Sequence, residues 1–189
     1  MRLHRTISPD APLLVVALEE EAAHLHVSDL PVLVTGAGKV NAAVALATTL
    51  ATASPSEVIN LGTAGALKPG VDGTHLITTV TQHDLDDAAL FALTGLHFSE
   101  PIHLGPEGLV LTTGDAFIAD PARRTELAAH ADLVDMEGYA VARVCQVLDM
   151  PLRLVKQVSD QADGSAGKSW RDTVDECAEV LGAWVRTHL

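Results

Sequence analysis

The sequence predicts an α/β fold in which one sheet carries helices on both faces. Three observations lead to this prediction. Short apolar runs with β-branched residues alternate with longer Ala-rich or amphipathic segments along the whole chain. Hydrophobic residues make up 48% of the sequence but aromatic residues only 3%, so the core must consist mostly of Ala, Val and Leu. No Pro/Gly-rich linker divides the 189 residues, which predicts a single domain over residues 1–189.

The N-terminal part of the chain predicts a leader, two strands and two helices. Residues 1–12 show no regular hydrophobic period, and we expect a loose leader there. LLVVAL (13–18) is short and apolar, as in a buried strand. EEEAAHLH (19–26) predicts a helix, because acidic residues in a first turn interact favourably with the helix dipole. A second strand follows over 31–36, and an Ala-rich helix that opens at glycine over 38–53.

The middle of the chain predicts three strands and a less regular segment. EVINLG (57–62) and THLITTVTQ (74–82) have the apolar and β-branched character of strands. Within residues 84–106, DDAALFAL (86–93) predicts a short helix, and the remainder predicts loop. GLVLTTG (108–114) predicts the next strand.

The last third of the chain returns to alternating helices and strands. Asp120 is a suitable N-cap and Pro121 a suitable first helical residue, so a helix is expected there. In the last segment, apolar residues recur at helical spacing. The expected elements are a helix over 120–130, a strand over 131–136, a helix over 137–149, a strand over 151–160 and a helix over 169–189.

The charge and the cysteine content disfavour several classes of function. A formal net charge of −13 opposes binding to nucleic-acid phosphates or anionic membranes, so we expect neither as a partner. The apolar run 11–18 is too short to span a bilayer, and glutamates follow it where a secretory signal would have a cleavage site. Cys145 and Cys177 lie in expected helices, and we expect both to be reduced and buried. The protein is therefore expected to be soluble and cytoplasmic.

Carboxylates and glycines gather where the expected strands end. Ligands of open α/β sheets bind at the carboxyl ends of the strands, so this gathering predicts a site. The Gly-rich segment GTAGAL (62–67) predicts either an ordinary turn or a backbone that a ligand can approach closely. The residues concerned are Glu19, Glu20, Glu21, the segments TGAGK, GTAGAL and TTGDAF, Asp135, Met136, Glu137, Ser159 and Asp160.

The other motifs are weaker candidates for a catalytic or binding site. TGAGKVN lacks the first glycine and the Ser or Thr of a phosphate loop, so a tight strand-to-helix turn is favoured. His24 and His26 point apart on the expected helix and cannot share a metal. His83 and the aspartates after it predict a solvated acidic loop rather than a cation site. The spacing leaves a Ser-His-Asp triad open, but no G-x-S-x-G nucleophile elbow occurs. We expect no metal and no cofactor.

Glu21, Glu137 and Asp160 remain as candidates for catalysis. Two carboxyl groups across a pocket would suit the hydrolysis of a glycosidic bond. One, kept protonated by burial, gives its proton to the leaving group, while the other stays ionised and activates water. The residues alone do not select this use of carboxylates over others.

The order of the motifs provides a more specific indication. ALEEE, TGAGKVNAA, NLGTAGAL, TTGDAFI, VDMEGYAVARVC and VKQVSDQAD follow one another between about Leu13 and Asp163. This order resembles the nucleoside phosphorylase/nucleosidase superfamily, and most of all its 5′-methylthioadenosine/S-adenosylhomocysteine nucleosidase branch. The resemblance implies a three-layer α/β sandwich with a central mixed sheet, a homodimer, and cleavage of the N-glycosidic bond between a purine and ribose.

The resemblance also implies roles for individual residues. Asp160 would be the acid that protonates purine N7, which requires a raised pKa, and Ser159 would orient it. Glu21 would activate the attacking water. Asp at position 160 would favour a 6-aminopurine such as adenine. The implied substrate-binding residues are Glu137 on the ribose hydroxyls, Met136 against the sugar, Phe117 and Ile118 at the base, and Thr63 near the water or phosphate.

Hydrolysis is favoured over phosphorolysis. Phosphorylases of the superfamily place an arginine just before the Gly-Thr or Gly-Ser turn, where this chain has Asn60 and Leu61. The glutamates of the first loop would also repel phosphate. A phosphorolytic enzyme, a non-catalytic nucleoside-binding protein and a structural subunit remain alternatives.

The chain departs from the family pattern in three places. The segments 22–31 and 84–106 are shorter than usual, and Lys156 stands where the family often has Arg. In the family, the region corresponding to 84–106 helps form the pocket for the 5′ substituent. The preference for a 5′ group is therefore not implied. Asp163 is expected to cap a turn or helix.

Overall fold

The computed structural model describes residues 1–25, 29–106 and 108–189. His26, the last residue of the expected first helix and one of the two histidines considered as metal ligands, lies outside these residues. The strands are β1 (Arg2–His4), β2 (Leu13–Val16), β3 (Val32–Val34), β4 (Val58–Ala66), β5 (Thr74–Gln82), β6 (Ile102–His103), β7 (Leu109–Thr113), β8 (Leu133–Asp135) and β9 (Leu152–Asp160). The helices are α1 (Glu19–Ala22), α2 (Lys39–Leu50), α3 (Asp87–Thr94), α4 (Pro121–Ala128), α5 (Gly138–Val147) and α6 (Ala166–His188).

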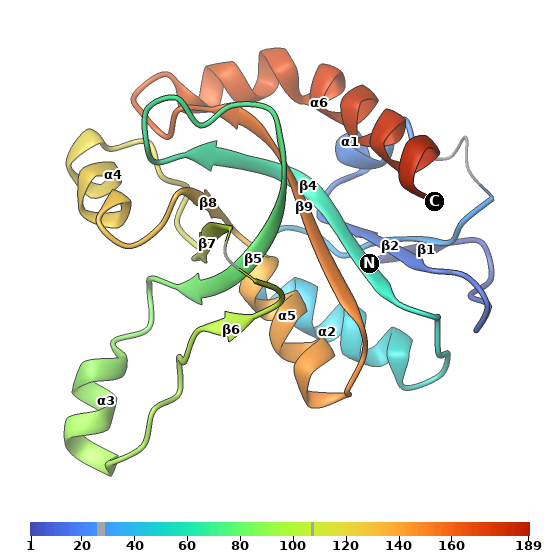
Figure 1. Cartoon of the computed structure of the whole chain (residues 1–189), viewed down its shortest axis with the longest axis horizontal. Helices are drawn as coiled ribbons and strands as arrows, with labels where there is room; N and C mark the ends of the chain where they lie inside the picture. The colour runs from blue at the N-terminus through green and yellow to red at the C-terminus, as the bar shows by residue number, and fades with distance from the viewer. Residues whose placement is uncertain (26–28, 107) are drawn as a thin grey trace.

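The strands join into one mixed sheet with helices on both sides (Figure 1). In the described residues the order is β1-β3-β2-β4-β8-β7-β5-β6, and β9 bridges β4 and β5. β9 runs parallel to β4 and antiparallel to β5, so β4, β8, β7, β5 and β9 close into a ring. The expected α/β sandwich with a central mixed sheet is confirmed.

The two faces of the sheet follow from the alternation of side chains along β2. Leu14 and Val16 pack with Leu181 and Val185 of α6 on one face. Leu13 and Val15 point to the other face, where they pack against α2 and α5. Figure 1 shows α1 and α6 on one side of the sheet, with α2 and α5 on the other. The expected burial of Cys145 and Cys177 is confirmed, and both thiols are free.

The structure corrects two expectations about the N-terminal half. The expected leader contains β1, which pairs antiparallel with β3 and extends the sheet by one strand. GTAGAL is not a turn, because β4 continues through it as far as Ala66. The continuation pairs with β9 on one edge and with β8 at its end, and a register shift lies between Ala64 and Gly65. Thr63 therefore projects from a strand.

The local signals for turns and helix caps are confirmed. Gly36 and Gly38 have φ of 90° and 94°, so TGAGK forms the tight turn into α2. Asp120 accepts a hydrogen bond from the Arg123 N–H at the start of α4. Asp163 accepts from the N–H and hydroxyl of Ser165, as a turn-capping residue would.

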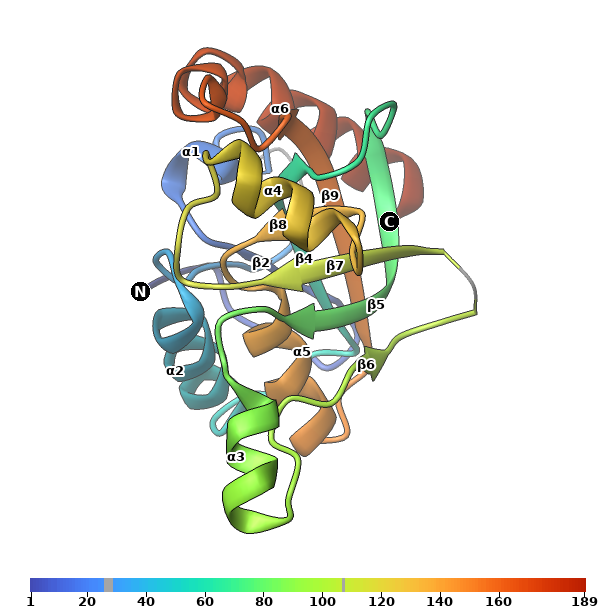
Figure 2. The same ribbon diagram turned by 90° about the vertical axis from the view of Figure 1, so that its left-hand side faces the viewer.

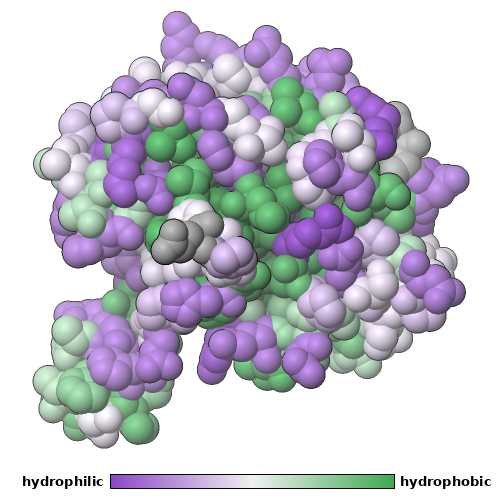
Figure 3. All heavy atoms as spheres, in the orientation of Figure 1, coloured by the Kyte–Doolittle hydropathy of each residue, from purple (hydrophilic) through white to green (hydrophobic). Residues whose placement is uncertain are grey.

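The segment 84–106 forms an arm that projects from the body and contains α3 (Figures 1 and 2). Two of the aspartates after His83 stabilise the arm. Asp86 caps α3, and Asp87 forms an ion pair with His97. Among the described residues, no cluster of His, Cys, Asp and Glu could hold a metal ion. Apolar side chains on the arm stand in solvent, and Figure 3 shows them as green spheres on a separate lobe. They include Phe91, Leu93, Leu96 and Phe98.

In the described part of the chain, every helix is too short or too polar to cross a membrane.

Candidate functional site

A cavity of about 220 Å³ lies where β2, β4, β8 and β9 end. This is the place that the strand-end residues predict. Seven of the eight residues named from the sequence line it: Glu21, Thr63, Phe117, Ile118, Met136, Glu137 and Asp160. Ser159 lies beside the cavity, where its hydroxyl donates to Asp160 Oδ2 at 2.9 Å. Residues spread over most of the chain thus meet at one point.

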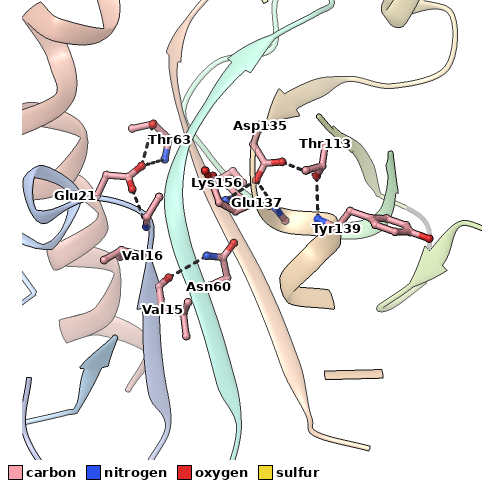
Figure 4. Close-up of polar contacts among 12 residues, drawn as sticks. Val15, Val16, Glu21, Asn60, Thr63, Thr113, Asp135, Glu137, Tyr139 and Lys156 are labelled. Carbon is pink, nitrogen blue, oxygen red and sulfur yellow. Dashed lines mark hydrogen bonds and ion pairs between the residues drawn. The ribbon is translucent and has the colours of Figure 1, made fainter. Parts of the chain in front are cut away.

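Glu21 is buried and surrounded by hydrogen-bond donors. Its Oε2 accepts from the N–H groups of Ala17 (3.1 Å) and Leu18 (3.2 Å), where β2 turns into α1. Its Oε1 accepts from the N–H (2.8 Å) and the hydroxyl (3.0 Å) of Thr63. Figure 4 shows Glu21 reaching across from α1 to Thr63 on β4. A carboxylate with this many donors is held as an acceptor in one orientation.

Asp160 occupies a different environment at the end of β9. Its Oδ1 accepts from the Ala162 N–H at 2.8 Å. A Cβ added to Gly65 would lie 3.0 Å from Asp160 Oδ1, a tight contact that would require this carboxyl to shift. Burial raises the pKa of Asp160, although the hydrogen bonds from Ala162 and Ser159 act in the opposite direction. The raised pKa expected from the sequence is confirmed.

Glu137 lines the cavity at the start of α5, two residues after the end of β8. Its Oε1 accepts from the Gly38 N–H at 2.7 Å. This hydrogen bond ties the turn into α2 to the wall of the cavity. Burial, with the neighbouring Asp135 carboxylate, raises the pKa of Glu137 to about 8.

Lys156 is a buried cation among these carboxylates. Its side chain is 2% exposed, and its Nζ lies 3.0 Å from Asp135 Oδ2. Burial alone would lower the pKa of Lys156, but Asp135, Glu137 and Glu21 together raise it. Asp135 is fixed in turn by hydrogen bonds from the Thr113 hydroxyl and the Gly138 N–H. Figure 4 shows Lys156, Asp135 and Thr113 joined in this network.

The apolar residues named from the sequence divide into a wall and a rim. Ile118 is buried and packs with Leu127 and Val134. Phe117 is 50% exposed and Met136 is partly exposed, so both can meet a ligand that enters the cavity. No hydrogen bond fixes these side chains, and their contribution is shape and apolar surface.

The structure adds residues for which no site role was inferred from the sequence. Trp170 lines the cavity from the first turns of α6, a position without a local signal. Lys156 was noted only as a replacement for Arg. A lysine directly after the apolar Leu154 and Val155 of a strand could have indicated a buried partner, since an unpaired buried charge is costly. The identity of that partner, Asp135, depends on pairing across the sheet.

Known proteins resemble this chain in sequence. The model of the family described as "Phosphorylase superfamily" matches residues 21–187. The 5′-methylthioadenosine/S-adenosylhomocysteine nucleosidase of Staphylococcus carnosus is 31% identical over 170 residues, which cover 77% of this chain and 74% of that protein. The protein of the same name from Actinobacillus succinogenes is 31% identical over 178 residues, covering 78% of this chain and 77% of that one.

Solved structures share the fold. A mutant of the Helicobacter pylori nucleosidase with 5′-methylthioadenosine in its active site has a TM-score of 0.84 at 21% identity, covering 94% of this chain and 97% of that chain. A mutant of futalosine hydrolase from the same organism has a TM-score of 0.84 at 20% identity, with the same coverage. At these identities the likeness establishes the fold alone. With the family match, it shows that the chain belongs to the phosphorylase superfamily.

Proposed function

We propose that the chain hydrolyses the N-glycosidic bond of a purine nucleoside, with adenine as the base and 5′-methylthioadenosine or S-adenosylhomocysteine as the substrate. One observation carries the proposal: a single cavity holds a carboxyl group with a raised pKa, Asp160, and a second one set among hydrogen-bond donors, Glu21. Like its curated relatives, the chain is an enzyme, an N-glycosyl hydrolase.

Asp160 is the proposed general acid. Its raised pKa keeps a proton on the carboxyl at a higher pH than an ordinary aspartate allows. As the bond between C1′ and N9 breaks, this proton passes to N7 of the purine, and the base leaves as a neutral molecule. Positioned proton transfer of this kind contributes about 10²–10⁴-fold to a rate.

Glu21 is the proposed general base. A water molecule beside it attacks C1′ and gives a proton to the carboxylate, so that ribose leaves with a new hydroxyl. The two carboxyl groups return to their starting states by exchanging protons with solvent. Glu21 would also stabilise the positive charge that develops on the ribose.

The remaining named residues are proposed to hold the substrate. Glu137 binds the ribose hydroxyls, and Met136 packs against the sugar. Phe117 and Ile118 contact the base, and Thr63 orients the water through Glu21. Ser159 orients Asp160 by the hydrogen bond to Oδ2.

The charge of the cavity supports hydrolysis over phosphorolysis. Among the described residues that line it, four are carboxylic acids and none is Arg or Lys. The Nζ of the buried Lys156 lies 3.0 Å from Asp135 Oδ2, so this carboxylate already balances its positive charge. Phosphate would enter an acidic cavity without a free counter-charge, whereas water would not be repelled.

Release of free base from a panel of nucleosides tests the proposal. The panel contains 5′-methylthioadenosine, S-adenosylhomocysteine, adenosine, inosine and futalosine, each with and without 10-fold excess phosphate. We expect adenine from the first two at a rate that phosphate does not change. Product that forms only with phosphate would identify a phosphorylase, and binding without product would identify a nucleoside-binding protein.

A homodimer is the proposed assembly. The apolar side chains of the arm, among them Leu93 at 82% and Leu96 at 61% exposure, would be covered by a second copy. Light scattering after size exclusion should give twice the mass of the 19.8 kDa chain. The cytoplasmic location expected from the sequence likewise stays a prediction, which cell fractionation can test.

A further inference from the structure

Trp170 is linked to the proposed base through one intervening side chain. It lies on α6, lines the cavity, and donates from its indole Nε1 to the Thr63 hydroxyl at 3.0 Å. The same hydroxyl lies 3.0 Å from Glu21 Oε1. A helix near the C-terminus therefore reaches the carboxylate that follows β2.

The chemistry of the three groups fixes the direction of this chain of hydrogen bonds. An indole N–H can only donate, so the Thr63 oxygen must accept from Trp170. The single proton of the hydroxyl is then free for Glu21, whose ionised carboxylate can only accept. The Thr63 N–H donates to the same carboxylate oxygen at 2.8 Å. Hydrogen bonds in such a chain polarise and strengthen one another.

We propose that Trp170 is a positioning residue for Glu21, acting through the hydroxyl of Thr63. The inference rests on the proposed function, because it assumes that Glu21 takes a proton from water. Without the indole N–H, the Thr63 hydroxyl can rotate away from Glu21. The carboxylate then loses an oriented donor and is held less firmly.

The variant Trp170→Phe separates this role from packing, because it keeps an aromatic ring and removes the N–H. We expect kcat at neutral pH to fall about fivefold while KM changes less than about twofold. The acid limb of the kcat profile should move up by about half a pH unit. Trp184 is the other tryptophan of the sequence, on the same helix, where its ring stacks on His188. Trp184→Phe is the matched control and should keep the wild-type profile.

A double-mutant cycle with Thr63→Val tests whether the effect passes through the hydroxyl. If it does, adding Trp170→Phe to Thr63→Val lowers kcat no further. An unchanged profile in Trp170→Phe, or independent effects of the two substitutions, would overturn the inference.

A fluorescence measurement tests the same chain without catalysis. Trp184→Phe leaves Trp170 as the only tryptophan, so its emission reports on the contact with Thr63. We expect the emission maximum to shift on adding Thr63→Val and, to a smaller extent, Glu21→Gln. No shift with either would refute the hydrogen-bond chain itself. If the variants show these shifts but the wild-type protein hydrolyses no nucleoside, the proposed function and, with it, the positioning role are refuted.

Discussion

Two carboxyl groups face one cavity, and their surroundings differ in kind. Glu21 lies among donors, with the N–H groups of Ala17 and Leu18 on one oxygen and Thr63 on the other. Asp160 has fewer donors, the Ala162 N–H and the Ser159 hydroxyl, and the nearby Asp163 adds a like charge that raises its pKa further. Donors favour the ionised form of a carboxyl, whereas burial favours the protonated form.

In the proposed mechanism, the different environments of Glu21 and Asp160 let one fold use the same functional group as a base and as an acid. Lys156, the buried cation of the site, lies close to Glu21. A Cβ on Gly62 would lie 3.2 Å from Glu21 Oε1 and 3.3 Å from Lys156 Nζ, so the ammonium is near Glu21. In the proposed mechanism, the environment at each strand end, rather than the residue type, assigns the role.

The largest effect is expected from Asp160→Asn, which removes the transferable proton. We expect kcat for 5′-methylthioadenosine to fall about 10³-fold with little change in KM. Asp163→Asn, three positions further along, is the comparison variant; it removes only a like charge near Asp160 and should lose far less activity. Steady-state release of adenine measures both. Equal losses in the two variants would remove the distinction between the aspartates.

Glu21→Gln should have the second largest effect, about 10²-fold on kcat. The amide keeps the size of the side chain but cannot take a proton from water, and its NH₂ group opposes the donors that surround it. Glu20→Gln, one residue earlier and exposed, is the control and should behave as wild type. Activity in Glu21→Gln close to that of wild type would show that another group activates the water.

Lys156→Met should mainly affect stability. It removes the partner of the buried Asp135 carboxylate, and breaking a buried pair in this way costs about 3–5 kcal/mol. Lys68→Met breaks a partly exposed pair with Asp132 and should cost about 1 kcal/mol or less. Urea unfolding gives both free energies. Similar values would mean that Lys156 is better solvated than its 2% exposure indicates.

The smallest effect is a pH dependence of stability from Glu137. Its pKa rises from 4.5 to about 8 on folding, so its stabilising contribution is complete below pH 4.5 and is lost as the pH rises through about 8. Glu137→Gln cannot ionise. At pH 9 it should therefore melt about 5 °C higher than wild type, and near pH 4.5 the advantage should vanish.

Thermal unfolding at constant ionic strength measures this difference, with Glu20→Gln as the control that follows wild type at every pH. A Glu137→Gln variant that is less stable than wild type at pH 9 would show that the ionised carboxylate stabilises the fold and that the pKa of Glu137 is not raised on folding.

Much of the site was predictable because the carboxyl ends of strands gather at one place in this class of fold. That rule brought Glu21, Glu137 and Asp160 together from distant parts of the chain. Local signals also sufficed for the Gly36 and Gly38 turn and for the cap at Asp120, since these depend on a few adjacent residues.

Features that depend on distant partners were missed. The sequence GTAGA has the composition of a turn, but pairing with β8 and β9 holds it as a strand. β1 lacks an apolar pattern and exists because β3 offers it an edge. Trp170 fits an amphipathic helix wherever the helix lies, so only the packing of α6 over the cavity reveals its contact with Thr63.

The division of roles between Asp160 and Glu21 is tested most directly by changing the leaving group. A riboside of 4-nitrophenol releases a stable anion and needs no proton, whereas an adenine nucleoside needs one. We predict that Asp160→Asn loses about 10³-fold on the adenine nucleoside but less than about tenfold on the nitrophenyl riboside. Glu21→Gln should lose about 10²-fold on both. Equal losses of Asp160→Asn on the two substrates would contradict its role as the acid.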